Sequence, residues 1–359
     1  MSKELNVLQI IDSLAVGGAE VMAVNIANGL ADTNVSSHIC VTRKEGLLKE
    51  KINTSVGYLF LNKKKAIDVK AILNLKTYIK THQINHIHAH SSSFFIAILV
   101  KFLIPSLKVI WHDHYGKSNE IEERKTLALK LGSFFFTSVV VVNQILYQWA
   151  EKNLKTKSIY YLANFSVLNK SELITKLKGI EGKRIVCLAA FRPQKDHLNL
   201  LKAFKNIQQK DPDWTLHLVG DHQKDDYFNK VFNSIKENNL NTTVYIYNAC
   251  LDVPNVLKQA TIGILSSNSE GLPLALLEYG LAKLPVVVTD VGDCSKVVMT
   301  GKSGTVIKKE NSLELEIALE ELINSEEKRK TYGELHYKNV INYYSQESFI
   351  NQLVKIYTL

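Results

Sequence analysis

The sequence predicts an α/β protein of two doubly wound domains, each a parallel sheet covered by helices. Three observations carry this prediction. The chain has 359 residues, and a domain commonly holds about 100–200 residues. Short apolar runs alternate with amphipathic segments in both halves of the chain, which is typical of parallel α/β folds. A polar, lysine-rich stretch at 166–183 separates the two series.

The first series occupies residues 1–165 and predicts an N-terminal domain. Its strand candidates are short and apolar, and several are continuously β-branched, as expected of strands buried on both faces of a parallel sheet. These strands are expected at 5–12, 36–42, 86–90, 107–112 and 138–143. Helical segments, with apolar residues three and four positions apart, are expected at 19–31, 66–82, 91–103 and 144–154.

After the predicted linker at 166–183, the alternation restarts and predicts a C-terminal domain over 184–340. Its strands are expected at 184–190, 214–220, 244–249, 262–267, 285–290 and 304–309. Its helices are expected at 199–209, 226–239, 253–260 and 272–282, with further helices from 312 onward. The last helix, at 341–359, is expected to cross back to the N-terminal domain. Ligands of such folds lie at the carboxyl ends of the strands, so we expect a substrate where the two domains face each other.

The composition is that of a globular protein, with 46% apolar and 22% charged residues. The four cysteines, at 40, 187, 250 and 294, form no C-x-x-C pair, so they favour neither a disulfide scaffold nor a zinc finger. The N-terminal segment lacks the features of a signal peptide, and no stretch reaches the roughly 18 apolar residues of a spanning helix. We therefore expect a cytoplasmic protein in a reducing setting.

Positive charge is concentrated in the first half of the chain. Residues 1–165 hold 20 Lys and Arg against 12 Asp and Glu, so this half carries most of the net charge of +9. This asymmetry suggests an anionic partner, either nucleic acid or an acidic membrane surface; a solvated lysine-rich surface is the alternative. The apolar segment 94–104 and the run Lys63, Lys64 and Lys65 are candidates for a basic, partly apolar surface, with a buried helix and a solvated loop as alternatives.

The most informative stretch is SEGLPLALLE at 269–278. Pro273 suits the first position of a helix. The backbone N–H groups of Gly271, Leu272 and Leu274 would then lie at the helix N-terminus, where free donors and the positive end of the dipole favour an anion such as a diphosphate.

Two glutamates belong to the same stretch. Glu278 would lie about one and a half turns into the helix, where its carboxylate could accept two hydrogen bonds from a vicinal diol. Glu270, in the loop before the helix, would face whatever is attached to the phosphate. A proline-started helix with one surface glutamate and one interior glutamate is the alternative interpretation.

The segment SSNSEGLPLALLEYGLAKLPVVVTDVG closely resembles the E-x7-E region of the retaining GT-B glycosyltransferases of family four, the glycosyl transferases group 1. Other features agree in order: GGAE at 17–20, HAHS at 88–91, His112 at the end of the strand LKVIW, and FRPQKDHLNLLKAF at 191–204. The resemblance covers essentially the whole chain. It implies the GT-B fold, in which two Rossmann-like domains face a cleft.

In this family, the first glutamate lies by the donor sugar, the second holds the nucleotide ribose, and a lysine neutralises the diphosphate. The resemblance assigns these roles to Glu270, Glu278 and Lys195. The family usually has an arginine five residues before that lysine, where this sequence has Ala190. Arg192 is a candidate for the same charge, because two extended residues span about 6.6 Å and a long side chain recovers part of that distance. The alternative is a weaker site with one cation.

Gly17 and Gly18 form a short glycine loop after the first strand. The loop is not G-x-G-x-x-G, so a dinucleotide fingerprint is absent. Two glycines allow the backbone to approach a substrate closely, and the resemblance implies a substrate-binding role for both. Plain loop geometry before a helix is the alternative.

Several histidines lie on two predicted strands and are candidate metal ligands. His86, His88 and His90 alternate along one strand and therefore share a face, and His112 and His114 end another strand. The sequence supplies no matching carboxylate ligand, and the family needs no metal, so we expect no metal site. The resemblance implies that His112 contacts the donor sugar.

The resemblance implies a retaining, metal-independent glycosyltransferase of the hexosyltransferase type. It would move a sugar from a nucleotide-sugar to a hydroxyl of a glycan or lipid-linked acceptor, in bacterial surface polysaccharide synthesis. The nucleotide-sugar is a substrate, so no cofactor is expected, nor is a nucleic-acid partner. We expect a location in the cytoplasm with peripheral contact at the inner face of the membrane. A sugar-nucleotide epimerase of GT-B architecture and a non-catalytic nucleotide-sugar-binding relative, the latter motivated by Ala190, are the alternatives.

Overall fold

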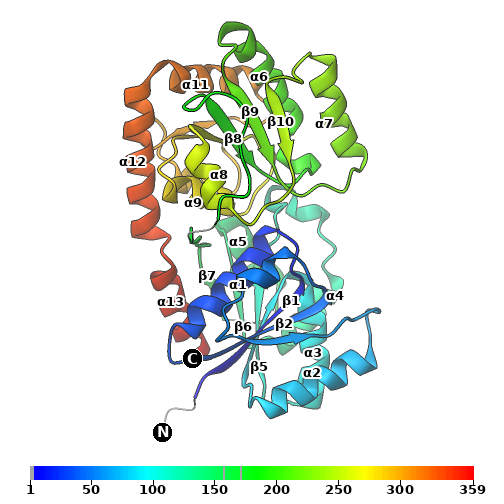
Figure 1. The fold of residues 1–359 in the computed structure, drawn as a ribbon. Helices are drawn as coiled ribbons and strands as arrows, with labels where there is room; N and C mark the ends of the chain where they lie inside the picture. Colours follow the sequence, from blue (N-terminus) through cyan, green and yellow to red (C-terminus); the bar gives the residue numbers. More distant parts are fainter. Residues whose placement is uncertain (1–3, 157, 170–171) are drawn as a thin grey trace. The chain divides into compact units, whose positions relative to one another are not determined.

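The computed structural model describes residues 4–156, 158–169 and 172–359. The chain divides into two compact units (Figure 1). The first contains the described residues of 1–115 and 120–165 together with 346–359, and the second contains 116–119 and the described residues of 166–345. Each unit holds one parallel sheet with helices packed against it, which confirms the predicted class of two doubly wound α/β domains.

Within the described residues, the sheet of the first unit has seven strands in the order β3-β2-β1-β4-β5-β6-β7. The strands are β1 (Asn6–Ser13), β2 (Ser36–Lys44), β3 (Gly57–Phe60), β4 (His86–His90), β5 (Lys108–Asp113), β6 (Ser138–Val141) and β7 (Ile159–Tyr161). The helices are α1 (Gly18–Ala31), α2 (Val69–Thr81), α3 (Phe94–Leu103), α4 (Leu127–Gly132), α5 (Gln144–Asn153) and α13 (Gln346–Thr358). Short 3-10 turns are η1 (Leu47–Lys51), η2 (Ser91–Ser93), η3 (Ser118–Glu123) and η4 (Ser133–Phe135).

The last helix, α13, packs against α1 within the first unit, as Figure 1 shows for the red and blue ends of the chain. Gly29 permits this contact, because a Cβ atom there would lie 3.0 Å from side-chain carbons of Ile350. The helix expected at 341–359 begins later, at Gln346, because the preceding helix continues to Tyr343.

The described part of the second unit has a six-stranded sheet in the order β10-β9-β8-β11-β12-β13. Its strands are β8 (Arg184–Leu188), β9 (Thr215–Val219), β10 (Val244–Tyr247), β11 (Ile262–Leu265), β12 (Val286–Thr289) and β13 (Thr305–Ile307). Its helices are α6 (His197–Lys210), α7 (Asp226–Glu237), α8 (Val253–Gln259), α9 (Leu274–Leu281), α10 (Cys294–Val297), α11 (Ser312–Asn324) and α12 (Glu326–Tyr343), and η5 (Pro193–Lys195) is a 3-10 turn.

The segment expected as a linker, 166–183, falls within the second unit. Its described part is bound to α8 and the residue before it. The Asp252 carboxylate accepts hydrogen bonds from the backbone N–H groups of Ile174 and Thr175, at 2.9 and 2.6 Å. The Gln259 side chain accepts another from the N–H of Leu177, at 3.0 Å. This segment is therefore attached to one unit over part of its length.

Two local expectations need correction. Lys63 was expected in an exposed lysine run, but its side chain is buried and only Lys64 and Lys65 are exposed. Burial lowers the pKa of Lys63. Pro273 was expected at the first helical position, but it is the N-cap of α9, with an extended ψ of 128°. Among the helices of the described chain, none has the length and apolarity needed to cross a membrane.

Candidate functional site

The order of the second sheet places a switch point between β8 and β11. These neighbouring strands pair only at their beginnings, where Ile262 faces Ile185 and Gly263 faces Val186. Their connections leave in opposite directions along the sheet, toward β9 and β12. In open α/β sheets, the carboxyl ends of two such strands are where ligands bind.

Tyr279 of α9 bridges the two strands where they separate. Its hydroxyl accepts a hydrogen bond from the N–H of Leu188, at 2.7 Å, and lies 3.2 and 3.3 Å from the carbonyl oxygens of Val186 and Ile264. Gly263 leaves room for the ring, because a Cβ atom there would lie 2.7 Å from it. The bridge satisfies backbone groups that the sheet leaves unpaired.

We expect Tyr279→Phe to destabilise the second unit by about 1–3 kcal/mol, because the partly buried N–H of Leu188 loses its acceptor. Urea unfolding measures this change. Tyr245→Phe is the matched control, since the hydroxyl of Tyr245 makes an exposed hydrogen bond to the nearby carbonyl of Thr242. Equal unfolding midpoints for the two variants would contradict a bridging role.

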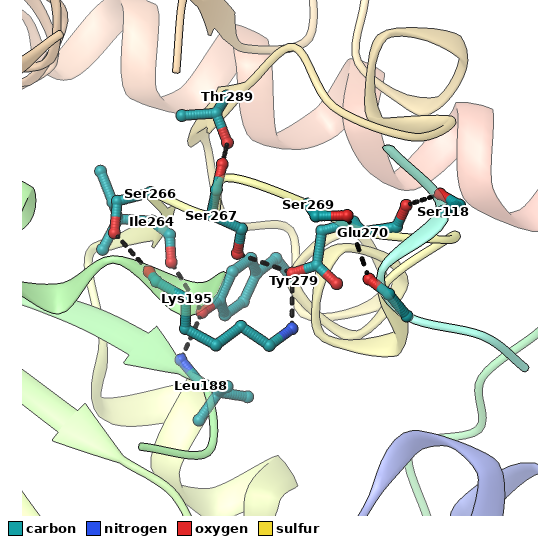
Figure 2. A network of polar contacts seen from close by, with 11 residues as sticks. Ser118, Leu188, Lys195, Ile264, Ser266, Ser267, Ser269, Glu270, Tyr279 and Thr289 are labelled. Atoms are coloured by element: carbon teal, nitrogen blue, oxygen red, sulfur yellow. Dashed lines mark hydrogen bonds and ion pairs between the residues drawn. The ribbon is translucent and has the colours of Figure 1, made fainter. Parts of the chain in front are cut away.

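Lys195 and Glu270 meet at this switch point (Figure 2). The Nζ atom of Lys195, from η5 after β8, lies 2.5 Å from Oε1 of Glu270, which follows β11. The Ser267 hydroxyl donates to the same oxygen at 2.7 Å, and Thr289 binds the Ser267 carbonyl at 2.6 Å. Glu270 is 4% exposed, so its carboxylate is held by partners at a buried position.

The two loops that carry this pair are bound to each other. The Ser266 hydroxyl donates to the carbonyl oxygens of Lys195 and Asp196, at 3.0 and 3.1 Å. The N–H of Asn268 donates to the carbonyl of Gln194, at 2.8 Å. Asp196 has a left-handed φ of 47° and caps α6 through its side chain. These contacts set the position of Lys195 relative to Glu270.

The backbone after Glu270 passes close to a second loop. Gly292 has a φ of +56°, and a Cβ atom there would lie 2.3 Å from the carbonyl oxygen of Gly271. Ser118 donates to the carbonyl of Glu270, and Asp293 donates its N–H to that of Gly271, at 2.9 Å. Only glycine fits this approach, so the backbone of 270–271 is firmly positioned.

The residues expected at the helix start lie where α9 begins. Leu272 and Leu274 are buried, and α9 starts at Leu274 after the capping Pro273. A helix start leaves backbone N–H groups without intrahelical partners and carries the positive end of the helix dipole. Gly271 and Leu272 therefore precede an end that favours negative charge.

Glu278 is the fifth residue of α9 and accepts a hydrogen bond from the Ser166 hydroxyl, at 3.3 Å. Its side chain is partly buried, and burial raises the pKa of Glu278 to about 7. Folding therefore favours the protonated acid, and this contribution to stability is lost as the pH rises from the unfolded value toward 7.

Arg192 and Ala190 lie in the loop between β8 and η5. Arg192 is exposed, and across the described residues its side chain makes no hydrogen bond or ion pair. The backbone at Ala190 is close to Gly220, where a Cβ atom would lie 2.9 Å from the Ala190 nitrogen. The structure thus shows a guanidinium without a protein partner two residues after the position where family four usually has its arginine.

In the first unit, Gly17 and Gly18 join β1 to α1. Gly17 is the N-cap of α1, and its carbonyl accepts the N–H of Val21, at 2.9 Å. A Cβ atom on Gly17 would meet the flexible Glu20 side chain, and one on Gly18 would meet nothing within 4 Å. Packing therefore does not require glycine at position 18.

His112 belongs to a buried cluster of histidines in the first unit. Parallel pairing places Gln9 beside His88 and His90 beside His112, so their side chains share one face of the sheet. Possible ligand atoms of His88, His90 and His112 lie within 4.8 Å of one another. Both ring nitrogens of His88 and both of His90 already have hydrogen-bond partners. A metal would have to displace these bonds.

Sequence reasoning missed the residues that support the site. Ser267, Tyr279 and Ser166 reach their partners only through tertiary packing. The serines before Glu270 belong to the quoted motif, but the motif did not predict which residues they contact. Tyr357, in α13, reaches the histidine cluster over a separation of 269 residues, for which the sequence offers no signal.

Two family models match the chain. The model described as glycosyl transferases group 1 matches residues 171–339, and the model of glycosyltransferase family 4 matches residues 16–158. The chain belongs to the group 1 glycosyltransferases and has the GT-B fold. This confirms the resemblance of the EGLP region to the GT-B group 1 glycosyltransferases.

Relatives of this glycosyltransferase include enzymes named for amylovoran biosynthesis and O-antigen biosynthesis. An uncharacterized glycosyltransferase of Methanocaldococcus jannaschii is 27% identical over 63% of this chain and 62% of its own length. An Escherichia coli UDP-Gal:alpha-D-GlcNAc-diphosphoundecaprenol alpha-1,3-galactosyltransferase is 24% identical over 75% of each chain.

Solved structures share the fold of this glycosyltransferase. Anabaena Alr3699/HepE, in complex with UDP and glucose, superposes with a TM-score of 0.83 at 17% identity, covering 99% of this chain and 100% of the other. TarM of Staphylococcus aureus, in a complex that includes UDP, superposes with a TM-score of 0.80 at 12% identity, covering 98% and 99%.

Proposed function

We propose that this glycosyltransferase transfers a hexose from a nucleotide-sugar to a hydroxyl of a glycan or lipid-linked acceptor, with retention of configuration, in bacterial surface polysaccharide synthesis. The observation that carries the proposal is the pair of Lys195 and Glu270 at the β8/β11 switch point, next to the start of α9. Relatives named for transfer to a diphosphoundecaprenol-linked sugar and for O-antigen synthesis support this acceptor class.

The proposed donor site uses charges of the second unit. Lys195, Arg192 and the N–H groups at the start of α9 neutralise the diphosphate, while Glu278 accepts the ribose hydroxyls and Glu270 faces the sugar. The bond between the sugar and the diphosphate breaks, and the acceptor oxygen bonds to the same face of the sugar carbon. The acceptor proton passes to the leaving diphosphate. Positioning and charge neutralisation supply the catalysis.

A panel of nucleoside diphosphates and their sugars tests this function. A ligand at 100 times its Kd should stabilise the protein by about 2.7 kcal/mol, which a thermal-shift assay detects. The stabilising donor is then incubated with and without lipid-linked acceptors. Transfer only in the presence of acceptor supports the proposal, whereas conversion of the donor without acceptor would indicate an epimerase. Weak binding with no product would indicate a non-catalytic relative.

Glu278 makes donor binding dependent on pH. Hydrogen bonds from a ribose diol favour the ionised carboxylate, so binding must remove the proton that burial retains up to about pH 7. We expect affinity for a nucleoside diphosphate to be about tenfold weaker at pH 6 than at pH 8. Glu278→Gln is the control. In this variant the nucleoside diphosphate still titrates, but the side chain at position 278 no longer does. Identical pH profiles for both proteins would exclude the proposed role.

We expect activity to survive EDTA. Cationic side chains and backbone N–H groups, rather than a divalent ion, are proposed to neutralise the diphosphate, with Lys195 as the partly buried cation. Transfer rates before and after chelation measure this directly. Loss of activity that magnesium or manganese restores would overturn the metal-independent mechanism.

We further propose that the first unit attaches peripherally to an anionic membrane at its inner face. Large apolar side chains, 44% to 75% exposed, occupy neighbouring elements: Phe102, Leu103, Leu127, Leu131 and Phe134, here named the apolar patch. The elements are in contact, because the Phe102 and Phe135 rings lie 4.7 Å apart and α3 packs on α4. An exposed apolar patch of this kind marks an interaction surface.

Charge favours lipid as the occupant of this surface. Lys125, two residues before Leu127 in the sequence, and Lys64 and Lys65 in the same unit are exposed, and the first half of the chain carries most of the net positive charge. Lysines attract anionic headgroups while apolar side chains enter the interface. The membrane proposal thus rests on the positive charge of the first half and on its exposed apolar side chains.

Vesicle flotation tests the membrane proposal. Binding to vesicles of phosphatidylcholine with phosphatidylglycerol should exceed binding to phosphatidylcholine alone and should fall with salt. Leu127→Glu with Phe134→Glu should abolish it. The control pair, Leu313→Glu with Ile317→Glu, changes similarly exposed residues of α11 and should bind normally. Equal binding by both double variants would refute the patch.

A further inference from the structure

A connected set of hydrogen bonds links the last helix to His112 through the sheet of the first unit. The Tyr357 hydroxyl lies 2.5 Å from Nδ1 of His88, and Nε2 of His88 lies 3.1 Å from Nδ1 of His112. The Gln9 amide touches the same hydroxyl through its nitrogen, at 3.5 Å, and Nε2 of His90 through its oxygen, at 2.9 Å. The five side chains form one network.

The orientation of the Gln9 amide decides which atom donates and which accepts in each hydrogen bond of this network. Its NH2 group donates to the Tyr357 oxygen, so the hydroxyl proton is directed to Nδ1 of His88. A neutral His88 that accepts at Nδ1 carries its proton on Nε2 and donates it to Nδ1 of His112. His112, accepting at Nδ1, then carries its own proton on Nε2.

This donor-to-acceptor direction requires that the rings of His88 and His112 are neutral, and burial keeps both rings neutral. Both His88 and His112 have no exposed surface. Burial lowers the pKa of His88 to about 3 and that of His112 well below its ordinary value. Nearby histidines lower both pKa values further.

The hydrogen-bond network ends at the Nε2 atom of His112. This atom is buried, and the described residues offer it no hydrogen-bond partner. Phe349 of α13 stacks on the His112 ring, with centroids 6.5 Å apart and an interplanar angle of 16°. A buried donor without a partner is costly, so this atom is suited to bind an oxygen of a ligand.

We propose that Tyr357, Gln9 and His88 are positioning residues that hold His112 as the neutral Nε2–H tautomer, which donates a hydrogen bond to an oxygen of the transferred sugar. The sugar contact rests on the proposed function, whereas the tautomer does not. The opposite direction, with the Gln9 amide reversed, would leave His112 with a bare Nε2 that accepts from a sugar hydroxyl. The two directions therefore predict opposite hydrogen-bonding roles for one atom.

Histidine 15N NMR on the unmodified protein tests the tautomer. We expect the signals of His112, assigned by their loss in His112→Gln, to show a protonated Nε2 and a bare Nδ1. An Nδ1–H tautomer or a doubly protonated ring would overturn the proposal. If the tautomer is found but no nucleotide-sugar is turned over, the proposed function fails while the positioning network stands.

A hydroxyl deletion tests the role of α13. Tyr357→Phe should shift His112 toward the Nδ1–H tautomer and lower kcat about three- to tenfold, with the donor KM within about twofold. Tyr78→Phe is the matched control, because Tyr78 also bonds a histidine of this unit, His38, at 2.9 Å, and should leave tautomer and kcat unchanged. A Tyr357→Phe protein with the original tautomer and kcat would refute the role of Tyr357.

Discussion

Lys195→Ala should lower kcat/KM by about 10- to 150-fold. The lysine is proposed to neutralise the donor diphosphate, and one charge-assisted contact contributes about 1.5–3 kcal/mol. Its side chain is 19% exposed and its Nζ atom lies 2.5 Å from Oε1 of Glu270, so the amine is positioned before any donor arrives. Steady-state kinetics with the donor identified by thermal shift measures the loss. The control is Lys283→Ala, which removes an exposed ion pair with Glu334 and should change kcat/KM by less than twofold.

Arg192 determines whether the diphosphate has a second cationic side chain. If Arg192 contacts the diphosphate, Arg192→Ala should cost about 1.5–3 kcal/mol, and the double variant with Lys195→Ala should deviate from additivity because both cations act on one group. If its guanidinium faces solvent throughout, the cost should stay below about 0.5 kcal/mol. Lys195→Ala with unchanged kinetics would contradict the proposed donor site itself.

Glu270→Ala should reduce kcat by about 10- to 150-fold while changing the donor KM much less. The carboxylate is proposed to bind the sugar, so its contribution appears in turnover more than in nucleotide affinity. It also orients Lys195 and accepts from Ser267, so its removal releases both side chains. Kinetics over a range of donor concentrations separates kcat from KM.

Glu316→Ala is the matched control for this change. Glu316 is also a mostly buried glutamate, with bonds to Lys210 at 2.9 Å and Asn206 at 2.6 Å, but it belongs to α11 and lies outside the site. The Glu316→Ala variant should be less stable than the original protein, but its folded fraction should keep the original kcat. If the two variants lost turnover equally, or if Glu270→Ala kept its full kcat, the sugar-facing role would be withdrawn.

Local patterns predicted much of the second unit correctly. Short apolar runs in alternation with amphipathic segments predicted β8, β11 and β12, and the EGLP sequence predicted that a helix starts beside the loop carrying Glu270. Such features depend on short-range chemistry: the side chains of a buried strand, and the backbone constraint of a proline at a helix start. α9 nevertheless starts at Leu274, one residue after the proline expected at the first helical position, because the extended ψ of Pro273 makes it the cap.

The sequence by itself determined the fold class, the family and the identity of the residues proposed to bind the donor. The tertiary structure alone decided their contacts. Lys195 bonds Glu270 across 75 residues, Tyr279 bridges two strands, and Tyr357 bonds His88 across 269 residues. These contacts depend on strand register and on the packing of a whole unit. Local sequence encodes which side chains are present and which face they share, whereas distant partners meet only after the chain has folded.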